Sequence, residues 1–460
     1  MTATVEAPAL RAGRREWVGL AVLALPALLV SLDVFVLVLA LPRLADALHA
    51  DGTEQLWIMD VYGFLIAGFM VTMGTLGDRI GRRKLLLAGA AAFGAASVVA
   101  AFSTSAAMLI GARAVLGIAG ATLAPSTLSL IGTMFRDPRQ RAEAIGIWAG
   151  CFTVGAIVGP VVGGFLLEHF WWGSVFLLGV PAMVLLLVLG PKLLPEYRDE
   201  TAGRLDLPSV ALSLGAILPA VYGVKELARD GVHLVPVAAL VAGLAVGYVF
   251  VQRQRTLDDP LVDLSLFAVP AFRTTLGGML LFSMLGGTTM LFVAQFFQLA
   301  QRLSPVGAAL GLLPGMAAST VSFLAAPVLA RRFPARGLIA GGVALAAAGM
   351  ATLVFADAAG GPVWPALGFA VTSLGVGPMV ALGTDLVVGS VPVRKAGAAS
   401  ALAQTVNEFG YSFGLATVGT LGGAVVRAHG FAAGLHVVAG LAAVAFAVLV
   451  RFVVKNLRAA

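Results

Sequence analysis

Long apolar stretches alternate with short polar joints along the whole chain. A helix of about 20 mostly apolar residues is long enough to cross a bilayer. The pattern therefore predicts membrane-spanning helices near residues 17–42, 55–77, 85–102, 106–134, 143–167, 173–191, 208–224, 234–251, 274–299, 305–330, 337–356, 361–390, 396–426 and 431–450.

The polar joints divide these fourteen helices into groups of six, two and six. The joints are tight within the first six, and the charged segments Lys192–Leu207 and Gln252–Arg273 flank the next two. Six-plus-six halves suggest an internal repeat. We expect an all-α polytopic membrane protein with a tail at 1–16, a six-helix bundle at 17–191, linkers with two additional helices at 192–273, a second bundle at 274–450 and a tail at 451–460.

Composition supports lipid as the solvent of this chain. Hydrophobic residues make up 59% and charged residues only 12%, whereas soluble domains carry about a quarter charged residues. The first apolar stretch, from Trp17, is too long for a signal-peptide core and lacks a convincing cleavage site. Cys151 is the only cysteine and the five histidines are scattered, so we expect neither an intrachain disulfide nor a metal site.

The net charge of +7 follows the expected topology. With the N-terminus in the cytoplasm, 24 of the 30 Lys and Arg residues lie on the cytoplasmic side of the membrane and five lie on the opposite side. The remaining one, Arg113, lies within a span. This positive-inside asymmetry predicts that both termini are cytoplasmic. It also explains the basic excess without a nucleic-acid partner, and we expect none.

Five Asp, Glu and Arg residues lie in the interior of the predicted spans, where each costs roughly 2.5–3.5 kcal/mol at a helix centre. Such groups normally face a cavity and mark a path for ions or substrates. They are Asp33 in the first span, Asp60 in the second, Arg113 in the fourth, Asp385 in the twelfth and Glu408, beside Asn407, in the thirteenth.

The acids outnumber the base, so Arg113 leaves at least one carboxyl group without a cation. A buried carboxyl group favours its protonated form. A group that accepts either a proton or a cationic substrate couples the two fluxes by competition. The alternatives are that Asp33 is a structural hydrogen-bond acceptor, that Asp60 and Asp385 reach water, and that Arg113 is a static counter-ion.

Aromatic residues in the same spans are candidates for a cavity lining that stacks on aromatic cations. Lipid contact or helix packing is the simpler explanation for any single one of them. The candidates are Trp57, Tyr62, Trp148, Phe292, Phe296 and Tyr411.

Two glycine-rich segments are candidates for parts that change conformation during transport. The joint after the second span combines a tight reversal with charges that can bond to helix ends, and we interpret it as a conformational latch: Gly74, Gly77, Asp78, Arg79, Gly81, Arg82 and Arg83. A purely topogenic basic loop is the alternative. The fifth span holds a helix-kinking proline among small residues, which predicts a hinge or a merely structural kink: Gly155, Gly159, Pro160, Gly163 and Gly164.

These segments resemble the major facilitator superfamily. Gly74–Lys84 resembles its signature loop, Ile110–Gly120 its fourth-span motif and Gly155–Gly164 its antiporter motif. Further matches are to the fourteen-span drug:proton exporters: Leu32–Pro42 resembles their first span, Trp57–Tyr62 their second, and Ala396–Gly410 the thirteenth-span region where members carry acids. The resemblance implies alternating access around a central cavity, with the fourth-span arginine active in proton transfer.

The resemblance implies a proton-coupled antiporter, not an enzyme, that exports amphipathic, often cationic drugs, dyes or antiseptics such as quaternary ammonium compounds. We expect no cofactor, a monomer in the bacterial inner membrane, and lipophilic cations, protons and lipid as partners. Export of one host metabolite or antibiotic is the alternative. A non-transporting membrane sensor is a third reading, but it predicts a soluble output domain that the sequence does not show.

Overall fold

The structure is a computed structural model that describes residues 11–196, 198, 206–257, 260, 262, 264–357, 360–389 and 396–456. The side chains of some residues within these ranges, Asp78 and Asp385 among them, lie outside the description. Every regular element in the described part of the chain is a helix. The expected all-α class is therefore confirmed.

The helices follow the predicted spans closely. The first half comprises α1 (Arg14–Leu48), α2 (Gly52–Ile80), α3 (Arg82–Ala101), α4 (Ala106–Met134), α5 (Pro138–His169), α6 (Ser174–Leu177) and α7 (Gly179–Leu193). Next come α8 (Leu207–Asp230), α9 (Leu234–Thr256) and the short η1 (Leu264–Ala268). The second half comprises α10 (Pro270–Gln295), η2 (Phe296–Ala300), α11 (Pro305–Leu329), α12 (Ala335–Leu353), α13 (Val363–Leu374), η3 (Pro378–Leu382), α14 (Gly383–Gly389), α15 (Ala396–Gly414), η5 (Leu415–Gly419), α16 (Thr420–His429) and α17 (Phe431–Asn456).

Among the described residues, thirteen helical segments are long and apolar enough to cross a membrane. They match every expected span except the second. That span corresponds to α2, a helix of 29 residues that packs against α4 and α15 within the bundle. The protein is thus a multi-pass helical membrane protein.

Side-chain caps fix where several helices begin. The Asp51 carboxylate accepts hydrogen bonds from the backbone N–H groups of Thr53 and Glu54, both at 2.8 Å, before α2. Ser105 and Ser304 cap α4 and α11 in the same way. Such caps satisfy N–H groups that have no partner inside the helix.

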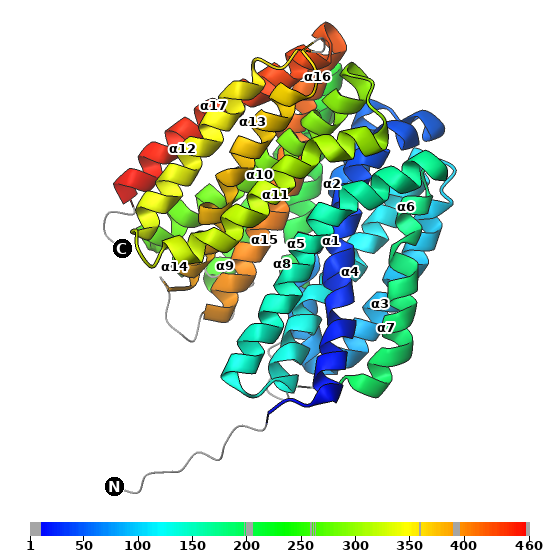
Figure 1. The fold of residues 1–460 in the computed structure, drawn as a ribbon, viewed down its shortest axis with the longest axis vertical. Helices are drawn as coiled ribbons and strands as arrows, with labels where there is room; N and C mark the ends of the chain where they lie inside the picture. The colour runs from blue at the N-terminus through cyan, green and yellow to red at the C-terminus, as the bar shows by residue number, and fades with distance from the viewer. Residues whose placement is uncertain are drawn as a thin grey trace, which may run out of the picture.

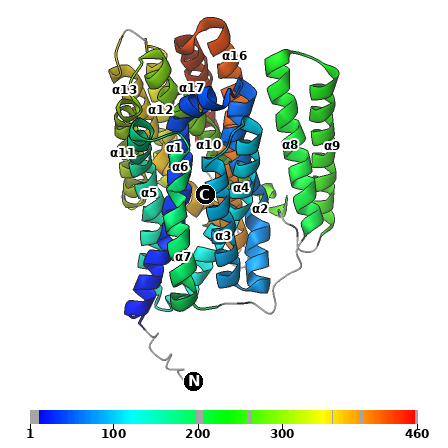
Figure 2. The ribbon, with the colours of Figure 1, turned by 90° about the vertical axis from the view of Figure 1, so that its right-hand side faces the viewer.

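The helices form two groups with a pair set to one side (Figures 1 and 2). α1 begins and α17 ends toward the same end of the bundle, here called the termini side; the other end is the opposite side (Figure 1). Figure 2 shows α8 and α9 as an antiparallel pair at the edge. Of the two helices, α8 makes the extensive contacts with the bundle. The α9 helix is largely exposed, as expected for a helix that faces lipid.

The α8 helix lies beside the seam between α2 and the η5 region of the second half. Phe64 of α2, Val221 of α8 and Ala416 of η5 form a small separate apolar cluster. Gly68 leaves room for Leu214, because a Cβ atom there would lie 2.6 Å from the leucine side chain. The additional pair is therefore anchored on both halves through α8.

A polar network joins the ends of α8 and α9 on the termini side. Arg253 donates from Nη2 to Asp206 at 2.8 Å and from Nε to the Ser209 hydroxyl at 3.1 Å. The buried Gln254 amide also donates to Ser209, at 2.7 Å, and accepts from the backbone N–H of Val262 at 3.0 Å. Burial, the largest effect, raises the pKa of Asp206, but the hydrogen bonds from Ser209 and Arg253 outweigh it and lower the pKa.

We predict that Asp206→Asn destabilises the protein by about 1 kcal/mol or less near neutral pH, because the pair is partly exposed to solvent. The pKa of Asp206 is lower in the folded than in the unfolded chain. Its contribution is therefore complete above the unfolded value of about 3.9 and disappears as pH falls through the folded value.

Thermal unfolding of purified protein between about pH 3 and pH 7 measures this effect. The difference in melting temperature between wild type and variant should shrink toward acidic pH. Glu143→Gln, at an exposed position of α5, is the matched control. A difference that does not change with pH would contradict the prediction.

Candidate functional site

A buried ion pair joins α1 and α4 in the middle of the first half. Arg113 donates from Nη1 to the Asp33 carboxylate, and the two side chains are 1% and 13% exposed. Arg113 also donates from Nε to the carbonyl of Ile58 at 3.1 Å. Its guanidinium carbon lies 4.4 Å from the ring centroid of Tyr62, as in a cation–π contact. Arg113, the only Lys or Arg within the predicted spans, thus neutralises Asp33 and is held by α2 as well.

Glu408 approaches this pair from the second half. On α15 it accepts a hydrogen bond from Gln404 at 3.2 Å, and no described Lys or Arg forms an ion pair with it. Tyr62 interacts electrostatically with Asp33, Arg113 and Glu408. Tyr62 therefore interacts both with the neutralised acid of one half and with an acid of the other half that has no counter-cation among the described residues.

The other predicted acids are placed differently. Asp60 is fully buried in α2, two residues before Tyr62. The side chain of Asp385, in α14, lies outside the described residues. The proposed roles of these acids remain predictions.

The structure brings two of the six candidate aromatic residues to this site. Tyr411 interacts electrostatically with Arg113 and Glu408, and its ring occupies space that a Cβ atom at Gly287 would fill. Tyr62 is the second. The hydroxyl groups of both tyrosines are buried without a hydrogen-bond partner among the described residues.

The other four candidates lie elsewhere. Trp148 donates to Thr127 at 3.1 Å, between α5 and α4. Trp57 packs against the cluster that links α2, α8 and η5. Phe292 and Phe296 are 3% and 0% exposed within the apolar core of the second half.

Sequence reasoning missed several polar residues next to Glu408. The Ser283 hydroxyl of α10 donates to Asn407 at 2.9 Å and so ties α10 to α15. Ser412 is fully buried and faces Gly63 of α2, where a Cβ atom would lie 1.9 Å from its hydroxyl oxygen. Asn407 was visible beside Glu408, but no sequence signal distinguishes Ser283 or Ser412 from other small residues in the spans.

The glycines of α5 allow α1 to approach closely. A Cβ atom at Gly155 would lie 2.7 Å from the carbonyl oxygen of Leu28, and one at Gly163 would lie 2.6 Å from Val36. Gly159 faces Leu32, adjacent to Asp33. Pro160 lies inside the continuous α5 helix. The predicted hinge is therefore the packing surface on which the Asp33 helix rests.

The two halves meet on the opposite side. Glu168, at the end of α5, accepts hydrogen bonds from the Ser304 hydroxyl and from the backbone N–H of Val306 at 3.3 Å. A Cβ atom at Gly164 would lie 3.0 Å from the Pro305 carbonyl. Toward the termini side the two groups of helices diverge (Figure 1). The halves are thus joined by a carboxylate of one at the helix N-terminus of the other, a favourable arrangement.

The predicted latch makes contacts on the termini side of the first half. Gly81 has a positive φ of 111°, which permits the reversal from α2 to α3. Arg83 forms an ion pair with Glu196 at 3.4 Å and donates to the carbonyl of Leu194 at 3.0 Å. Arg82 is 8% exposed and lies over Gly77. The contacts of Arg83 tie the loop to the end of α7. The other two described residues of the predicted latch make no such contact: Gly74 faces Pro125, and Arg79 is exposed.

Fold and site together define a helical membrane transporter with ionisable groups at the junction of two halves. Residues 23–415 match the sequence profile of the Major Facilitator Superfamily, and the chain belongs to this family. It is therefore a transporter and not an enzyme.

Several relatives match over most of their length. The chain is 44% identical to the multidrug efflux pump LfrA of Mycolicibacterium smegmatis over 420 residues, which cover 91% of this chain and 83% of that protein. It is 36% identical to the methyl viologen resistance protein SmvA of Salmonella typhimurium, with 93% and 86% covered. The tetracenomycin C resistance and export protein of Streptomyces glaucescens is 32% identical, with 88% and 76% covered.

Solved structures support the fold. A mutant of peptide transporter POT in complex with sulfate superposes with a TM-score of 0.72 at 17% identity, with 95% of this chain and 94% of that chain covered. A POT family transporter in complex with 5-aminolevulinic acid gives 0.69 at 15% identity, with 95% and 96% covered. At this level of identity the likeness concerns the fold alone.

We predict that Gly155→Val destabilises the protein by about 1–3 kcal/mol, because the added side chain must push α1 away from α5. Gly146→Val is the matched control on the same helix, since a Cβ atom there meets nothing within 4 Å. Thermal unfolding in detergent measures both. Equal stability of the two variants would show that the close approach of α1 and α5 is unimportant.

We also predict a strong coupling between Arg113 and Asp33. Arg113→Gln leaves a buried carboxylate without its cation, which costs roughly 3–5 kcal/mol. The double variant Arg113→Gln with Asp33→Asn should regain part of that stability. A double-mutant cycle on thermal unfolding measures the coupling, and strictly additive effects would refute it.

Proposed function

We propose that the chain is a proton-coupled antiporter that exports amphipathic, often cationic drugs, dyes or antiseptics by alternating access. The observation that carries this proposal is the meeting of ionisable groups from both halves at Tyr62. One acid is neutralised by Arg113, and the other, Glu408, has no counter-cation among the described residues. The similarity to a multidrug efflux pump and to two resistance proteins supports drug export.

The arrangement suggests how exchange occurs. Glu408 in its ionised form attracts a cationic substrate, and the neighbouring tyrosine rings can stack on it. Protonation of the carboxyl group removes the attraction and releases the substrate. Protonation of Asp33 would free Arg113, whose positive charge then disfavours a cation at the same junction. Both effects make proton and substrate alternative occupants.

The structure supports a direction for the open side. The halves are joined through Glu168 on the opposite side and diverge toward the termini side. With both termini in the cytoplasm, as the distribution of Lys and Arg suggests, the side on which the halves diverge faces the cytoplasm. Substrate would then bind from inside a bacterial inner membrane and leave outside. We propose a monomer that needs no cofactor beyond the proton gradient.

Export of a single host metabolite or antibiotic is the second candidate function. It is favoured by the similarity to a tetracenomycin C resistance and export protein. The same chemistry would serve either function. The two differ in the number of compounds that are moved.

We predict that everted vesicles containing the protein accumulate a fluorescent lipophilic cation such as ethidium only while a proton gradient is present. Asp33→Asn and Glu408→Gln should each lower this uptake by about 10²-fold, because each removes a group that can change protonation. Glu143→Gln, an exposed carboxyl group of α5, is the matched control.

Uptake that persists after the gradient is collapsed would exclude antiport. Full activity of both variants would exclude the proposed sites. Failure to move any lipophilic cation, with one host metabolite moved well, would favour the second candidate function.

A further inference from the structure

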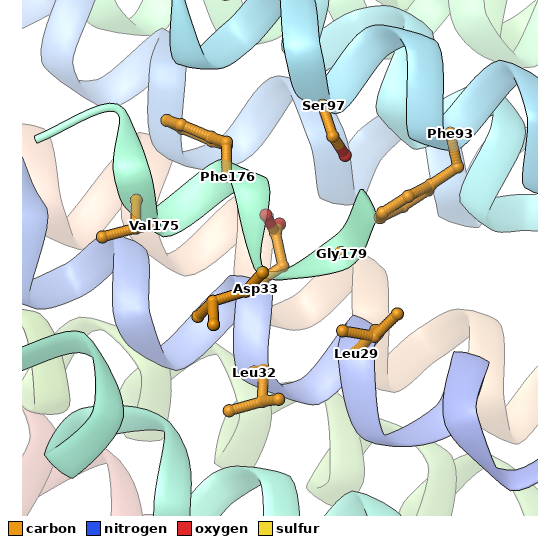
Figure 3. A pocket seen from close by; sticks show the side chains of 9 residues that line it. Leu29, Leu32, Asp33, Phe93, Ser97, Val175, Phe176 and Gly179 are labelled. Atoms are coloured by element: carbon orange, nitrogen blue, oxygen red, sulfur yellow. The ribbon is translucent and has the colours of Figure 1, made fainter. Parts of the chain in front are cut away.

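A small pocket reaches Asp33 from the side that faces away from the second half. Its walls belong to α1, α3, α6 and α7 and to the residue between the last two, and no helix of the second half contributes (Figure 3). The lining residues are Leu29, Leu32, Asp33, Phe93, Ser97, Val175, Phe176, Leu178 and Gly179. Asp33 therefore has two different surroundings: it contacts Arg113 on one side and borders this pocket on the other.

Ser97 is the second polar side chain of the pocket. It is 2% exposed, yet its hydroxyl has no hydrogen-bond partner among the described residues. Most hydroxyls in these helices bond to a carbonyl of their own helix, as Thr122 does to Ala119 at 2.7 Å. A buried hydroxyl without a hydrogen-bond partner is unfavourable. Figure 3 shows the Ser97 hydroxyl and the Asp33 carboxylate directed into the same space.

The size of the pocket limits what it can hold. It has room for about one water molecule. Pockets for drug-sized ligands are about 300 Å³ or larger. A water that bridges Ser97 and Asp33 fits the pocket in both size and polarity, whereas a substrate does not.

The position of the pocket indicates which side it serves. Ser97 lies in the last turns of α3, and Gly179 is the first residue of α7, so both lie in the part of the first half nearest the opposite side. Among the described residues, the charged and titratable groups that interact with Asp33 from neighbouring helices are Arg113 of α4 and Tyr62 of α2. The pocket itself contributes no other charge.

We propose that protons reach Asp33 through this pocket, by way of a water held by Ser97, and not through the junction where substrate binds. In this step the water gives one proton to the Asp33 carboxylate and receives one from the opposite side, so its own composition is unchanged. Protonated Asp33 then releases Arg113. The inference rests on the proposed antiport function and adds a proton path separate from the substrate path.

Two substitutions fill the pocket without replacing either residue of the ion pair. Ser97→Val removes the hydroxyl and adds a methyl group. Gly179→Val places its Cβ atom at ordinary contact distances of 3.4 Å from Phe93 and 3.5 Å from the Ser97 hydroxyl, with its methyl groups reaching further. Ala95→Val, at an exposed position of α3, is the matched control.

Each variant is measured in proteoliposomes with ethidium as the probe. Gradient-driven transport needs proton loading, whereas ethidium counterflow at equal pH on both sides needs only substrate exchange. Both pocket variants should lose about 10-fold or more of the gradient-driven rate. Counterflow and the Kd for ethidium should stay within about 2-fold of wild type, since the substrate path is untouched.

Unchanged gradient-driven rates in both variants would overturn the proton path. A parallel loss of gradient-driven transport and counterflow would also overturn it, because that result shows a merely structural role. If wild-type transport itself ignores the gradient while counterflow persists, the proposed antiport function fails and this inference fails with it.

Discussion

The ion pair between Arg113 and Asp33 is the interaction on which the arrangement of the first half depends. A charge in the middle of a spanning helix is expensive in hydrocarbon, and two such charges are tolerable only when their geometry is good and their other hydrogen-bonding groups are satisfied. Arg113 meets that condition through Asp33 on α1, and through Ile58 and Tyr62 on α2. Three helices are consequently held at fixed positions around one guanidinium group.

Close helix packing makes this geometry possible. Helix association in lipid depends on van der Waals contact, so small residues that admit a neighbouring backbone are favoured. Gly155, Gly159 and Gly163 admit α1 to α5, and Gly117 of α4 admits the backbone of α2 at Tyr62, where a Cβ atom would lie 2.6 Å from the Tyr62 carbonyl. The charged pair and the glycines are thus parts of one constraint: the pair needs short distances between helices, and the glycines provide them.

The sequence predicted the spans well because length and apolarity are local properties of the chain, and these two properties decide whether a helix can cross a bilayer. It also indicated that Arg113 neutralises one acid of the spans, because base and acids could be counted. It could not show that Asp33 is the partner, that Tyr62 interacts with both Arg113 and Glu408, or that Ser97 shares a pocket with Asp33. Those relations depend on the rotation of one helix against another, and helices whose every face is apolar carry little periodic signal to fix that rotation. For the same reason Trp57, Phe292 and Phe296 resembled Tyr62 in sequence, yet pack elsewhere.

Asp33 has a counter-cation and Glu408 has none among the described residues, because Arg113, the only Lys or Arg within the predicted spans, lies in the same half as Asp33. Asp33 and Arg113 belong to the same half, so their pair can persist while the halves move relative to each other. Glu408 belongs to the other half: its backbone carbonyl faces Gly63 of α2, and its side chain interacts electrostatically with Tyr62. Any motion that opens the seam between α2 and α15 therefore changes the surroundings of Glu408 far more than those of Asp33. Coupling between proton and substrate then needs no long-range signal, because the moving boundary itself passes between the two acids.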